Sequence, residues 1–328
     1  MHKQVHIVGT GSYLPEGRLD NQELAQRLGV TSDWIFQRTG ILQRCVAAPG
    51  QATSDLAIEA AKEAIRSSGI GVSVIDLIIV ATSTPDTLIP STACRVQQAL
   101  GAGSVGAFDI GAACSGFVYG LTTASGYIQS GLARNILLIG AEVRTRFTDY
   151  SDINTACLYG DGAGAVILAP SSDEKKKIFG LSIGANGRGS GAISLPAGGS
   201  RQPASQETVD KGLHFVRIEG RSVITSAVRC LTKLIEDTLK QAGITTDDID
   251  LIIPHQMNLR LIESVAKRAK IPIETFFINI ERCGNTSAAS MPIALDEALR
   301  QDRIRSGNLI MLVAFGAGFT WGSALIRW

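Results

Sequence analysis

The sequence predicts an α/β protein built from two copies of one structural unit, for two reasons. An internal repeat, G-I-x-x-x-x-I-D-L-I-I, occurs at residues 69–79 and again at 243–253. In addition, apolar runs such as LIIVA at 77–81 and LIMLV at 309–313 contain no polar residue. Such runs are typical of strands that helices cover on both faces of a sheet. We therefore expect a layered α/β architecture.

The segments around the repeat recur in the same order in both halves of the chain. Each copy follows a run with helical spacing, and Gly69 and Gly243 are expected to end these helices. Three further pairs of segments match in order: 107–116 with 277–285, 135–142 with 308–316, and 162–168 with 321–327. The chain is therefore predicted to consist of two halves, residues 1–172 and 173–328, related by a pseudo-two-fold axis.

The composition is that of a globular protein and excludes several classes of partner. The 328 residues carry a formal charge of +1, with 45% hydrophobic and 19% charged residues, so we expect no nucleic-acid partner. No apolar run reaches the roughly 18 residues of a membrane helix, so we expect no membrane segment and a cytoplasmic location. The six cysteines form no C-x-x-C pair, which favours reduced thiols over disulfides or a zinc site.

One segment departs from the regular pattern. Residues 185–212 are rich in Gly, Ser and Pro and show little periodicity. We expect a long excursion over the surface or across a subunit contact, and a loop exposed to solvent is an equally good interpretation.

Cys114 is the first candidate for chemistry, because it lies in a turn of small residues, GAACSGF, between an expected strand and an expected helix. A sulfur at a helix N-terminus is close to backbone N–H groups and to the positive end of the helix dipole, which stabilise a thiolate. The small neighbours leave room for a substrate carbonyl to approach the backbone. A packed core thiol is the alternative that this segment alone leaves open.

His255 and Asn285 lie in corresponding places of the second half. His255 follows the second copy of the repeat, and Asn285 lies in the turn RCGNTSAAS, which matches the turn of Cys114. A pseudo-two-fold axis brings equivalent strand ends together, so we expect these three residues in one pocket. The glycine-rich segment 314–322 adds backbone N–H groups that can face an oxyanion.

A series of motifs resembles a known enzyme family from about residue 8 to the last residue. The motifs are, in order, GTGSYLP, WIFQRTGI, AFDIGAACSGF, YGDGAGAV, PHQMN, GNTSAAS and FGAGFTWGSALIRW. They resemble the 3-oxoacyl-[acyl-carrier-protein] synthase III family, the condensing enzymes that start type II fatty acid synthesis. The resemblance implies the duplicated thiolase-like fold with five layers, α-β-α-β-α, and a homodimer.

The same resemblance implies a decarboxylative Claisen condensation by a triad of Cys114, His255 and Asn285, without a metal or a redox cofactor. Cys114 would take the acyl group of a primer acyl-CoA, while the backbone N–H groups of Cys114 and Ala317 stabilise the oxyanion. His255 and Asn285 would then hydrogen-bond the thioester carbonyl of malonyl-acyl carrier protein as it loses CO2. The product would be 3-oxoacyl-acyl carrier protein.

Two sets of carrier-binding residues follow from the resemblance. Trp34 and Arg38 would stack on either side of the coenzyme A adenine, and Asn258 would line the pantetheine tunnel. The residues that would dock the acidic carrier protein lie on one basic helical segment: Arg260, Lys267 and Arg268.

The acyl pocket is expected at Ile89, Tyr159 and Phe315. Ile89 and Tyr159 stand where the family often has Phe, so we expect branched or longer primers to be used besides, or in place of, acetyl. Equal or better use of acetyl-CoA in a condensation assay would contradict this expectation.

Three departures from the family pattern fall near the carrier sites. Met257 replaces a small residue in the PHQMN motif, Ile153 stands where an Arg that contacts coenzyme A is common, and Thr225 stands where a carrier-docking Lys is common. These departures affect the expected identity of the thioester carriers and leave the expected triad unchanged. They leave open an alternative function: a specialised condensing enzyme of secondary-metabolite or signal biosynthesis that uses malonyl-CoA or another thioester.

Overall fold

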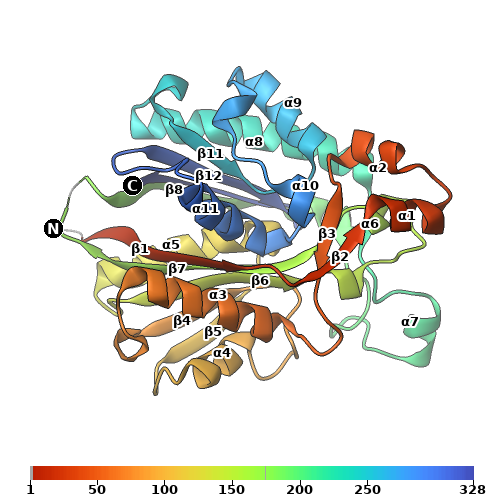
Figure 1. The fold of residues 1–328 in the computed structure, drawn as a ribbon, viewed down its shortest axis with the longest axis horizontal. Helices are drawn as coiled ribbons and strands as arrows, with labels where there is room; N and C mark the ends of the chain where they lie inside the picture. The colour runs from red at the N-terminus through yellow and green to blue at the C-terminus, as the bar shows by residue number, and fades with distance from the viewer. Residues whose placement is uncertain (1–2, 174) are drawn as a thin grey trace.

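A computed structural model of the chain describes residues 3–173 and 175–328. Two large β-sheets alternate with three layers of helices, so that the molecule consists of five layers (Figure 1). The five-layered α/β architecture that the sequence predicts is therefore confirmed.

The two large sheets have the same strand order, which confirms the duplication. The neighbours in the first sheet are, in order, β1 (Gln4–Tyr13), β7 (Asp161–Ser171), β6 (Ile136–Val143), β4 (Leu77–Ala81) and β5 (Gly106–Ile110). The second sheet repeats the first four places with β8 (Lys177–Ala185), β13 (Thr320–Arg327), β12 (Leu309–Gly316) and β11 (Leu251–Pro254).

The fifth place of the second sheet differs from the sequence expectation. Only Phe276 occupies it, through an isolated bridge to Ile252, so the segment 277–285 does not begin with a strand. A 3-10 turn that follows Pro272 precedes this position, and the chain turns into helix again at Ile280. Too few extended residues remain between the two helical turns for a ladder to form.

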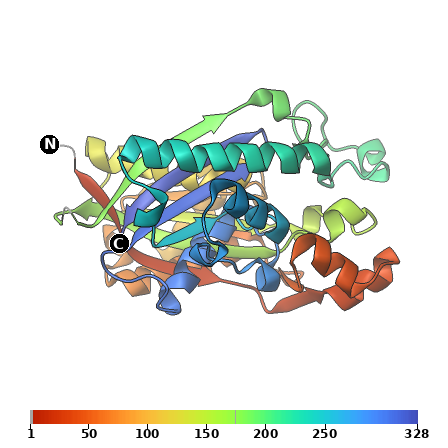
Figure 2. The same ribbon diagram turned by 90° about the horizontal axis from the view of Figure 1, so that it is seen from above.

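Helices of the two halves cover corresponding faces of the sheets. The outer layers are α3 (Thr53–Ser68) and α4 (Thr92–Leu100) on the first sheet, and α8 (Gly220–Ala242) and α9 (Leu259–Ala269) on the second. The middle layer consists of α5 (Gly116–Ser130) and α11 (Ser290–Arg300). Seen from above, α8 runs over the second sheet (Figure 2). Gly69 and Gly243, both with φ 70°, end α3 and α8 as predicted.

Strand β12 of the second sheet is buried on both faces. On β12, Leu312 and Ala314 pack into the core around the middle layer, whereas Val313 and Phe315 pack into the core under α8 and α9. Successive side chains of a strand point to opposite faces, so two separate cores fill the space on either side of one sheet. This explains why the run LIMLV has no polar position.

The remaining elements connect the layers, and several of them gather at one end of the molecule, on the right of Figure 1. That group comprises β2 (Gly17–Asp20), α1 (Asn21–Leu28), α2 (Ser32–Thr39), β3 (Gln43–Val46), α6 (Ile153–Ala156) and α7 (Gln206–Asp210). The other short elements are β9 (Ile193–Ser194), β10 (Arg217–Ile218), α10 (Ile280–Cys283) and the 3-10 turns η1 (Val72–Val74), η2 (Ala113–Ser115), η3 (Thr145–Phe147), η4 (Gly187–Gly189), η5 (Thr246–Asp248), η6 (Ile273–Thr275) and η7 (Ser287–Ala289).

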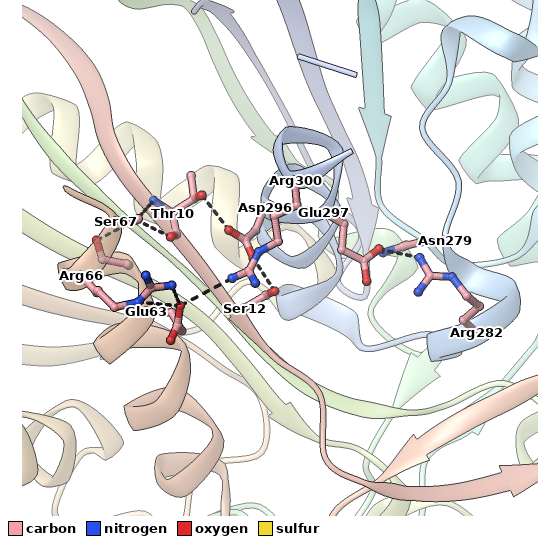
Figure 3. Close-up of polar contacts among 11 residues, drawn as sticks. Thr10, Ser12, Glu63, Arg66, Ser67, Asn279, Arg282, Asp296, Glu297 and Arg300 are labelled. Carbon is pink, nitrogen blue, oxygen red and sulfur yellow. Dashed lines mark hydrogen bonds and ion pairs between the residues drawn. The ribbon is translucent and has the colours of Figure 1, made fainter. Parts of the chain in front are cut away.

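A buried carboxylate ties the middle layer to the first sheet (Figure 3). Asp296 of α11 accepts hydrogen bonds from Thr10 Oγ1 (2.7 Å) and Ser12 Oγ (2.6 Å) of β1. Arg300 donates to the same carboxylate from Nε (2.9 Å) and lies 3.7 Å from Glu63 of α3. Because these donors satisfy the buried charge, α11 is held in place without an unpaired polar group.

No helix in residues 3–173 and 175–328 combines the length and the apolar character that crossing a membrane requires. The division into halves at residues 172 and 173 stays a prediction. The strands of the first large sheet end at Ser171, and those of the second begin at Lys177.

Gly140 of β6 allows a close backbone contact between the two halves. A Cβ at this position would clash with the carbonyl group of Ala288 in η7, whose carbon would be 3.0 Å away, and with Ala289 Cα at 3.2 Å. Neither neighbour is the end of a flexible side chain, so the clash cannot be relieved locally.

We therefore predict that Gly140→Ala lowers the free energy of unfolding by about 1–3 kcal/mol. Gly126→Ala is the matched control, because Gly126 is exposed on α5 and a Cβ there would have no neighbour within 4 Å. The control should raise the free energy by about 0.5–1 kcal/mol through helix propensity. Urea unfolding followed by circular dichroism measures both, and equal effects of the two variants would show that the contact at Gly140 is not tight.

Candidate active site

Cys114 lies in the η2 turn between β5 and α5. The residue before it, Ala113, has φ 47°, a left-handed conformation that is uncommon for a residue with a Cβ and strains the backbone. The η7 turn stands at the same place before α11, and its first residue, Ser287, has φ 51°. The pseudo-two-fold counterpart of Cys114 is therefore Ala288, and the strain is present in both turns.

The end of β12 packs directly against the turn that holds Cys114. A Cβ on Gly316 would stand 2.9 Å from the backbone nitrogen of Cys114, so this approach requires glycine. Thr320 Oγ1 of β13 donates to the carbonyl oxygen of Ala112 (3.0 Å) and fixes the same turn. These contacts bring Cys114 and Ala317 to the wall of one cavity.

His255 follows β11 directly, and its backbone N–H donates to the Val313 carbonyl oxygen of β12 (2.8 Å). The residue is 4% exposed and is not among those that line the cavity, but the charge of Arg144, which does line it, acts on the imidazole. Nδ1 lies 2.7 Å from Ser290 Oγ at the start of α11, and Nε2 has no hydrogen-bond partner among the described residues. One ring nitrogen therefore orients the imidazole and the other is available to a ligand.

Asn285 is held by hydrogen bonds on its backbone and on its side chain. Its backbone N–H donates to the Leu158 carbonyl oxygen (2.9 Å), and its own carbonyl oxygen accepts from the Gly160 N–H (3.1 Å). Its Oδ1 accepts from the Ser287 N–H (2.9 Å). Because the side-chain oxygen is engaged, the amide nitrogen is the group that Asn285 can present to a ligand in the cavity that it lines.

Glu142, at the end of β6, is a fully buried acceptor that joins the two halves behind Cys114. It accepts from Ser83 Oγ (2.8 Å) and Thr84 Oγ1 (2.7 Å), which follow β4, and from Ser287 Oγ (2.9 Å) of η7. Both carboxylate oxygens also accept from the Ser83 N–H at 3.2 Å. Several donors thus compensate the desolvation of this carboxylate.

Burial dominates the electrostatics of the site. It raises the pKa of the Cys114 thiol, against the opposing effects of a hydrogen bond with Ser287 and of the positive charge of Arg144. Burial, together with the smaller effect of the Arg144 charge, lowers the pKa of His255 to about 3. Both groups are therefore neutral at pH 7. The thiolate stabilisation expected from the helix N-terminus is outweighed by the loss of solvation.

The cavity has a volume of about 430 Å³ and receives residues from both halves of the chain. It brings together most of the site residues that the sequence predicts, namely Cys114, Asn285, Ala317, Tyr159, Trp34, Arg38 and Asn258. Residues 193–195 of the segment 185–212 form part of its wall. That segment is therefore an excursion that packs against the site, and the interpretation as a solvent loop is wrong for this stretch.

Trp34 and Arg38, one turn apart on α2, form a cation–π pair with 4.1 Å between the guanidinium carbon and the ring centroid. Asn258 is the N-cap of α9, where its Oδ1 accepts from the Arg260 N–H (2.8 Å). Its Nδ2 donates to the Arg38 carbonyl oxygen (3.0 Å). Asn258 thus joins α9 to α2 at the wall of the cavity.

Two residues predicted for the acyl pocket lie elsewhere. Ile89 is 88% exposed and does not line the cavity of this chain. Phe315 packs against Phe319, with 4.8 Å between the ring centroids, in the core under α8 and α9. The alternation of side chains along β12 turns Phe315 to that face, away from the cavity. Of the three predicted residues, only Tyr159 lines the cavity.

The residues predicted to dock a carrier protein have different surroundings. Arg260 Nε donates to the Gln37 carbonyl oxygen (2.8 Å), and its Nη1 pairs with Glu263 (3.0 Å), so it holds α9 to α2. Lys267 and Arg268 are exposed in the last turn of α9. Of the positions that depart from the family pattern, Met257 and Ile153 line the cavity, and Thr225 is exposed on α8.

Three polar residues of the site are missing from the sequence analysis: Glu142, Ser290 and Arg144. Glu142 lies at the end of an otherwise apolar strand and Arg144 directly follows it, and a charged residue in such a position is a signal that the sequence offers. Ser290 had no comparable signal, because only the fold shows that it faces His255. Among the described residues, no group of three or more His, Cys, Asp or Glu side chains could hold a metal ion.

Comparison with known proteins identifies related sequences and structures over the whole chain. The family model described as 3-oxoacyl-[acyl-carrier-protein] synthase III matches residues 108–187, and the model of the C-terminal part of that enzyme matches residues 239–328. A β-ketoacyl-[acyl-carrier-protein] synthase III from Caldanaerobacter subterraneus subsp. tengcongensis is 48% identical over 98% of this chain and 97% of the relative. One from Clostridioides difficile is 44% identical over 100% of this chain and 99% of the relative.

A solved structure agrees with these relatives. The crystal structure of 3-oxoacyl-[acyl-carrier-protein] synthase III from Aquifex aeolicus superposes with a TM-score of 0.91 and 41% identity, covering 99% of this chain and 100% of that one. These relatives give the specialised condensing enzyme no support over the synthase of fatty acid synthesis.

The raised pKa of Cys114 predicts how its alkylation depends on pH. Because the thiolate is the nucleophile, the rate of reaction with iodoacetamide should rise about tenfold per pH unit without a plateau below pH 9. Peptide mass spectrometry can follow Cys114 and the exposed Cys94 in the same sample, with Cys94 as the reference. An inflection of the Cys114 rate below pH 8 would contradict the argument from burial.

Proposed function

This chain belongs to the 3-oxoacyl-[acyl-carrier-protein] synthase III family, and on that premise we propose that Cys114, His255 and Asn285 carry out its condensation. Members of this family are acyl-transferring condensing enzymes of fatty acid synthesis, and the function of this chain is the same decarboxylative condensation. The proposal concerns which residues perform each step and which carriers deliver the two acyl groups. One observation carries it: two strained turns, related by the duplication, bring Cys114 and Asn285 to one cavity, and the charge of Arg144, which lines that cavity, acts on the buried His255.

The first step transfers an acyl group from a primer acyl-CoA to Cys114. The sulfur attacks the thioester carbonyl carbon, the new S–C bond forms, and the bond to the coenzyme A sulfur breaks. The proton of the Cys114 thiol leaves in this exchange and coenzyme A departs as its thiol. The backbone N–H groups of Cys114 and Ala317 stabilise the oxyanion, and the packing of Gly316 against the turn supports this assignment.

The second step is the decarboxylation of malonyl-acyl carrier protein, for which His255 supplies a neutral donor. The Gln256 N–H donates to Ser290 Oγ (3.3 Å), so we infer that the hydroxyl proton of Ser290 goes to His255 Nδ1 (2.7 Å). This assigns the remaining ring proton to Nε2. Nε2–H and the Asn285 amide then hydrogen-bond the thioester carbonyl, on which negative charge accumulates as CO2 leaves. The carbanion attacks the acyl carbon on Cys114, a C–C bond forms and the S–C bond breaks. The sulfur leaves as a thiolate and takes up a proton from water.

The walls of the cavity support coenzyme A and a carrier protein as the two carriers. Trp34 and Arg38 offer an aromatic and a cationic face to an adenine, provided that their mutual stacking opens. The exposed Lys267 and Arg268 offer positive charge to an acidic carrier protein. Because a thioester is already activated and the N–H donors meet the developing charge, the proposed steps need no metal or redox cofactor.

A homodimer in the cytoplasm is the proposed state of the protein. Leu88 and Ile89 are 81% and 88% exposed at adjacent positions, which supports a subunit contact there. The same contact would explain why Ile89 does not line the cavity of the single chain. Size-exclusion chromatography with light scattering distinguishes the dimer from a monomer.

Intact mass spectrometry tests the first step and identifies the carriers. Wild-type protein incubated with acyl-CoAs should gain the mass of one acyl group, and Cys114→Ala should gain none. Malonyl-acyl carrier protein should then discharge the adduct. No adduct with any acyl-CoA, or discharge by malonyl-CoA alone, would overturn the proposed role in chain initiation.

Substitution of the two donors separates the second step from the first. His255→Ala and Asn285→Ala should keep the acylation of Cys114 but lower the rate of CO2 release from malonyl-acyl carrier protein by about 100- to 1,000-fold, the usual cost of losing an oxyanion donor. Release of labelled CO2 measures the second step and the acyl adduct measures the first. Equal loss of both steps in either variant would show that the residue supports the structure and does not act as a donor.

A further inference from the structure

Arg144 places a positive charge in the wall of the acyl cavity. It follows β6 directly and lines the cavity together with Ser83, Cys114 and Tyr159. Most of the other lining side chains are apolar, such as Leu195, Val216, Ile218, Val223 and Leu261. A guanidinium in such surroundings loses solvation, so its hydrogen-bond partners decide whether it is a structural or a ligand-binding group.

The partners of Arg144 satisfy only part of its guanidinium. Its Nη1 donates to Ser83 Oγ at 3.4 Å, and the group lies over the Tyr159 ring, 4.5 Å from the ring centroid, with a hydrogen bond to that tyrosine. Its Nε is buried without a hydrogen-bond partner among the described residues. No ion pair within 4.0 Å joins Arg144 to a carboxylate of the described chain. A buried donor without an acceptor is destabilising, so a ligand that supplies the acceptor is favoured.

Arg44, a second buried arginine, shows what a structural guanidinium looks like in the same protein. Its Nη2 and Nε donate to the Cys157 carbonyl oxygen (2.6 and 3.2 Å), and its Nη1 donates to Asn21 Oδ1 (2.5 Å). Burial lowers its pKa to about 10. Arg144, by contrast, keeps its full positive charge: burial opposes the charge, but Tyr159, Glu142 and Cys114 outweigh this effect and raise its pKa.

Arg144 lines the same cavity as Cys114, and its charge acts on the Cys114 thiol. Its charge affects the pKa of both Cys114 and His255, whereas the cation–π pair of Trp34 and Arg38 lies at another part of the wall, on α2. The nearby carboxylate of Glu142 is occupied by the hydroxyl groups of Ser83, Thr84 and Ser287. Arg144 is therefore placed to meet the acyl group of a substrate and not its nucleotide.

We propose that this cavity takes an acyl group with a carboxylate at its far end, as in a dicarboxylic acyl-CoA, and that Arg144 binds that carboxylate. The inference rests on the proposed function, because it assumes that Cys114 carries the acyl group. Cys114 takes the acyl carbon from coenzyme A, whose sulfur leaves as the thiol, and the terminal carboxylate passes through this exchange unchanged. The planar guanidinium can donate from Nε and one Nη to the two oxygens of a carboxylate.

The carboxylate of the malonyl extender is a less suitable partner for Arg144. That carboxylate has to leave as neutral CO2, so an ion pair with it would stabilise the ground state more than the transition state and slow decarboxylation. The terminal carboxylate of a primer keeps its charge throughout the reaction. An ion pair with Arg144 therefore adds binding energy without opposing either step.

Acylation rates with pairs of thioesters of equal chain length test the proposal. Succinyl-CoA is compared with butyryl-CoA, and glutaryl-CoA with valeryl-CoA, by quenched intact mass spectrometry of the adduct on Cys114, with acetyl-CoA as a further reference. For at least one pair, wild type should use the diacid about tenfold or more faster, the usual value of a hydrogen bond to a charged group. Arg144→Met should reverse this preference. Because the charge of Arg144 also lowers the pKa of Cys114, its loss should slow acylation by both members of a pair, so the ratio of the two rates is the readout. Arg144→Lys, which keeps the charge, should retain part of the preference.

Arg146→Met is the matched control, because Arg146 is exposed and its Nη2 donates to the carbonyl oxygens of Ala48 and Pro49 (both 3.0 Å), away from the cavity. It should not change the preference. Faster acylation by the neutral member of both pairs in wild type, or an unchanged preference in Arg144→Met, would overturn the role of Arg144 and leave the proposed function intact. If Arg144→Met changed only the rate of CO2 release, Arg144 would act on the malonyl extender, and its proposed role toward the primer carboxylate would also be overturned. No acylation of wild type by any thioester would instead overturn the proposed function itself.

Discussion

The close approach of the η7 turn to strand β6 at Gly140 is the contact on which the geometry of the site depends. Ala288 packs on Gly140, and Ser287 next to it donates to Glu142 and holds the side chain of Asn285. On the other side of the pseudo-two-fold axis, Gly316 allows β12 to reach the backbone of Cys114. A side chain at either glycine would separate the two strained turns, because a close-packed interior has no slack to absorb the displacement.

Loss of solvation is the second constraint, and it acts in opposite ways on the two proposed reacting groups. Burial keeps His255 neutral, so that it can serve as a hydrogen-bond donor to a developing negative charge without first losing a proton. The same burial raises the pKa of Cys114 and leaves less thiolate for the attack on a thioester. Burial thus favours the proposed decarboxylation, in which His255 is a neutral donor, but it lowers the fraction of Cys114 that is present as the nucleophilic thiolate. Substrate binding, the backbone N–H groups and the charge of Arg144 are the features that can compensate for this cost.

The two buried arginines show that the partners of a charge, and not its burial, determine its role. Each of the three side-chain nitrogens of Arg44 donates to a carbonyl oxygen or an amide oxygen, and the residue joins β3 to the chain near α6. Arg144 has a buried Nε without a partner and faces the cavity. A structural arginine is satisfied before a ligand arrives, whereas a ligand-binding arginine is satisfied only afterwards. This difference makes the acyl cavity unlike a purely apolar pocket.

The repeat, the uninterrupted apolar runs and the end glycines Gly69 and Gly243 determined the duplicated, layered fold, because hydrophobic pattern and helix termination are local properties of the chain. The order of the matching segments also indicated that Cys114 and Asn285 meet. Only the tertiary structure decided the register of side chains, which turns Phe315 into a core, and the exposure of Ile89. It also decided the partners of His255 and Arg144, because hydrogen bonds and desolvation depend on residues far apart in the sequence.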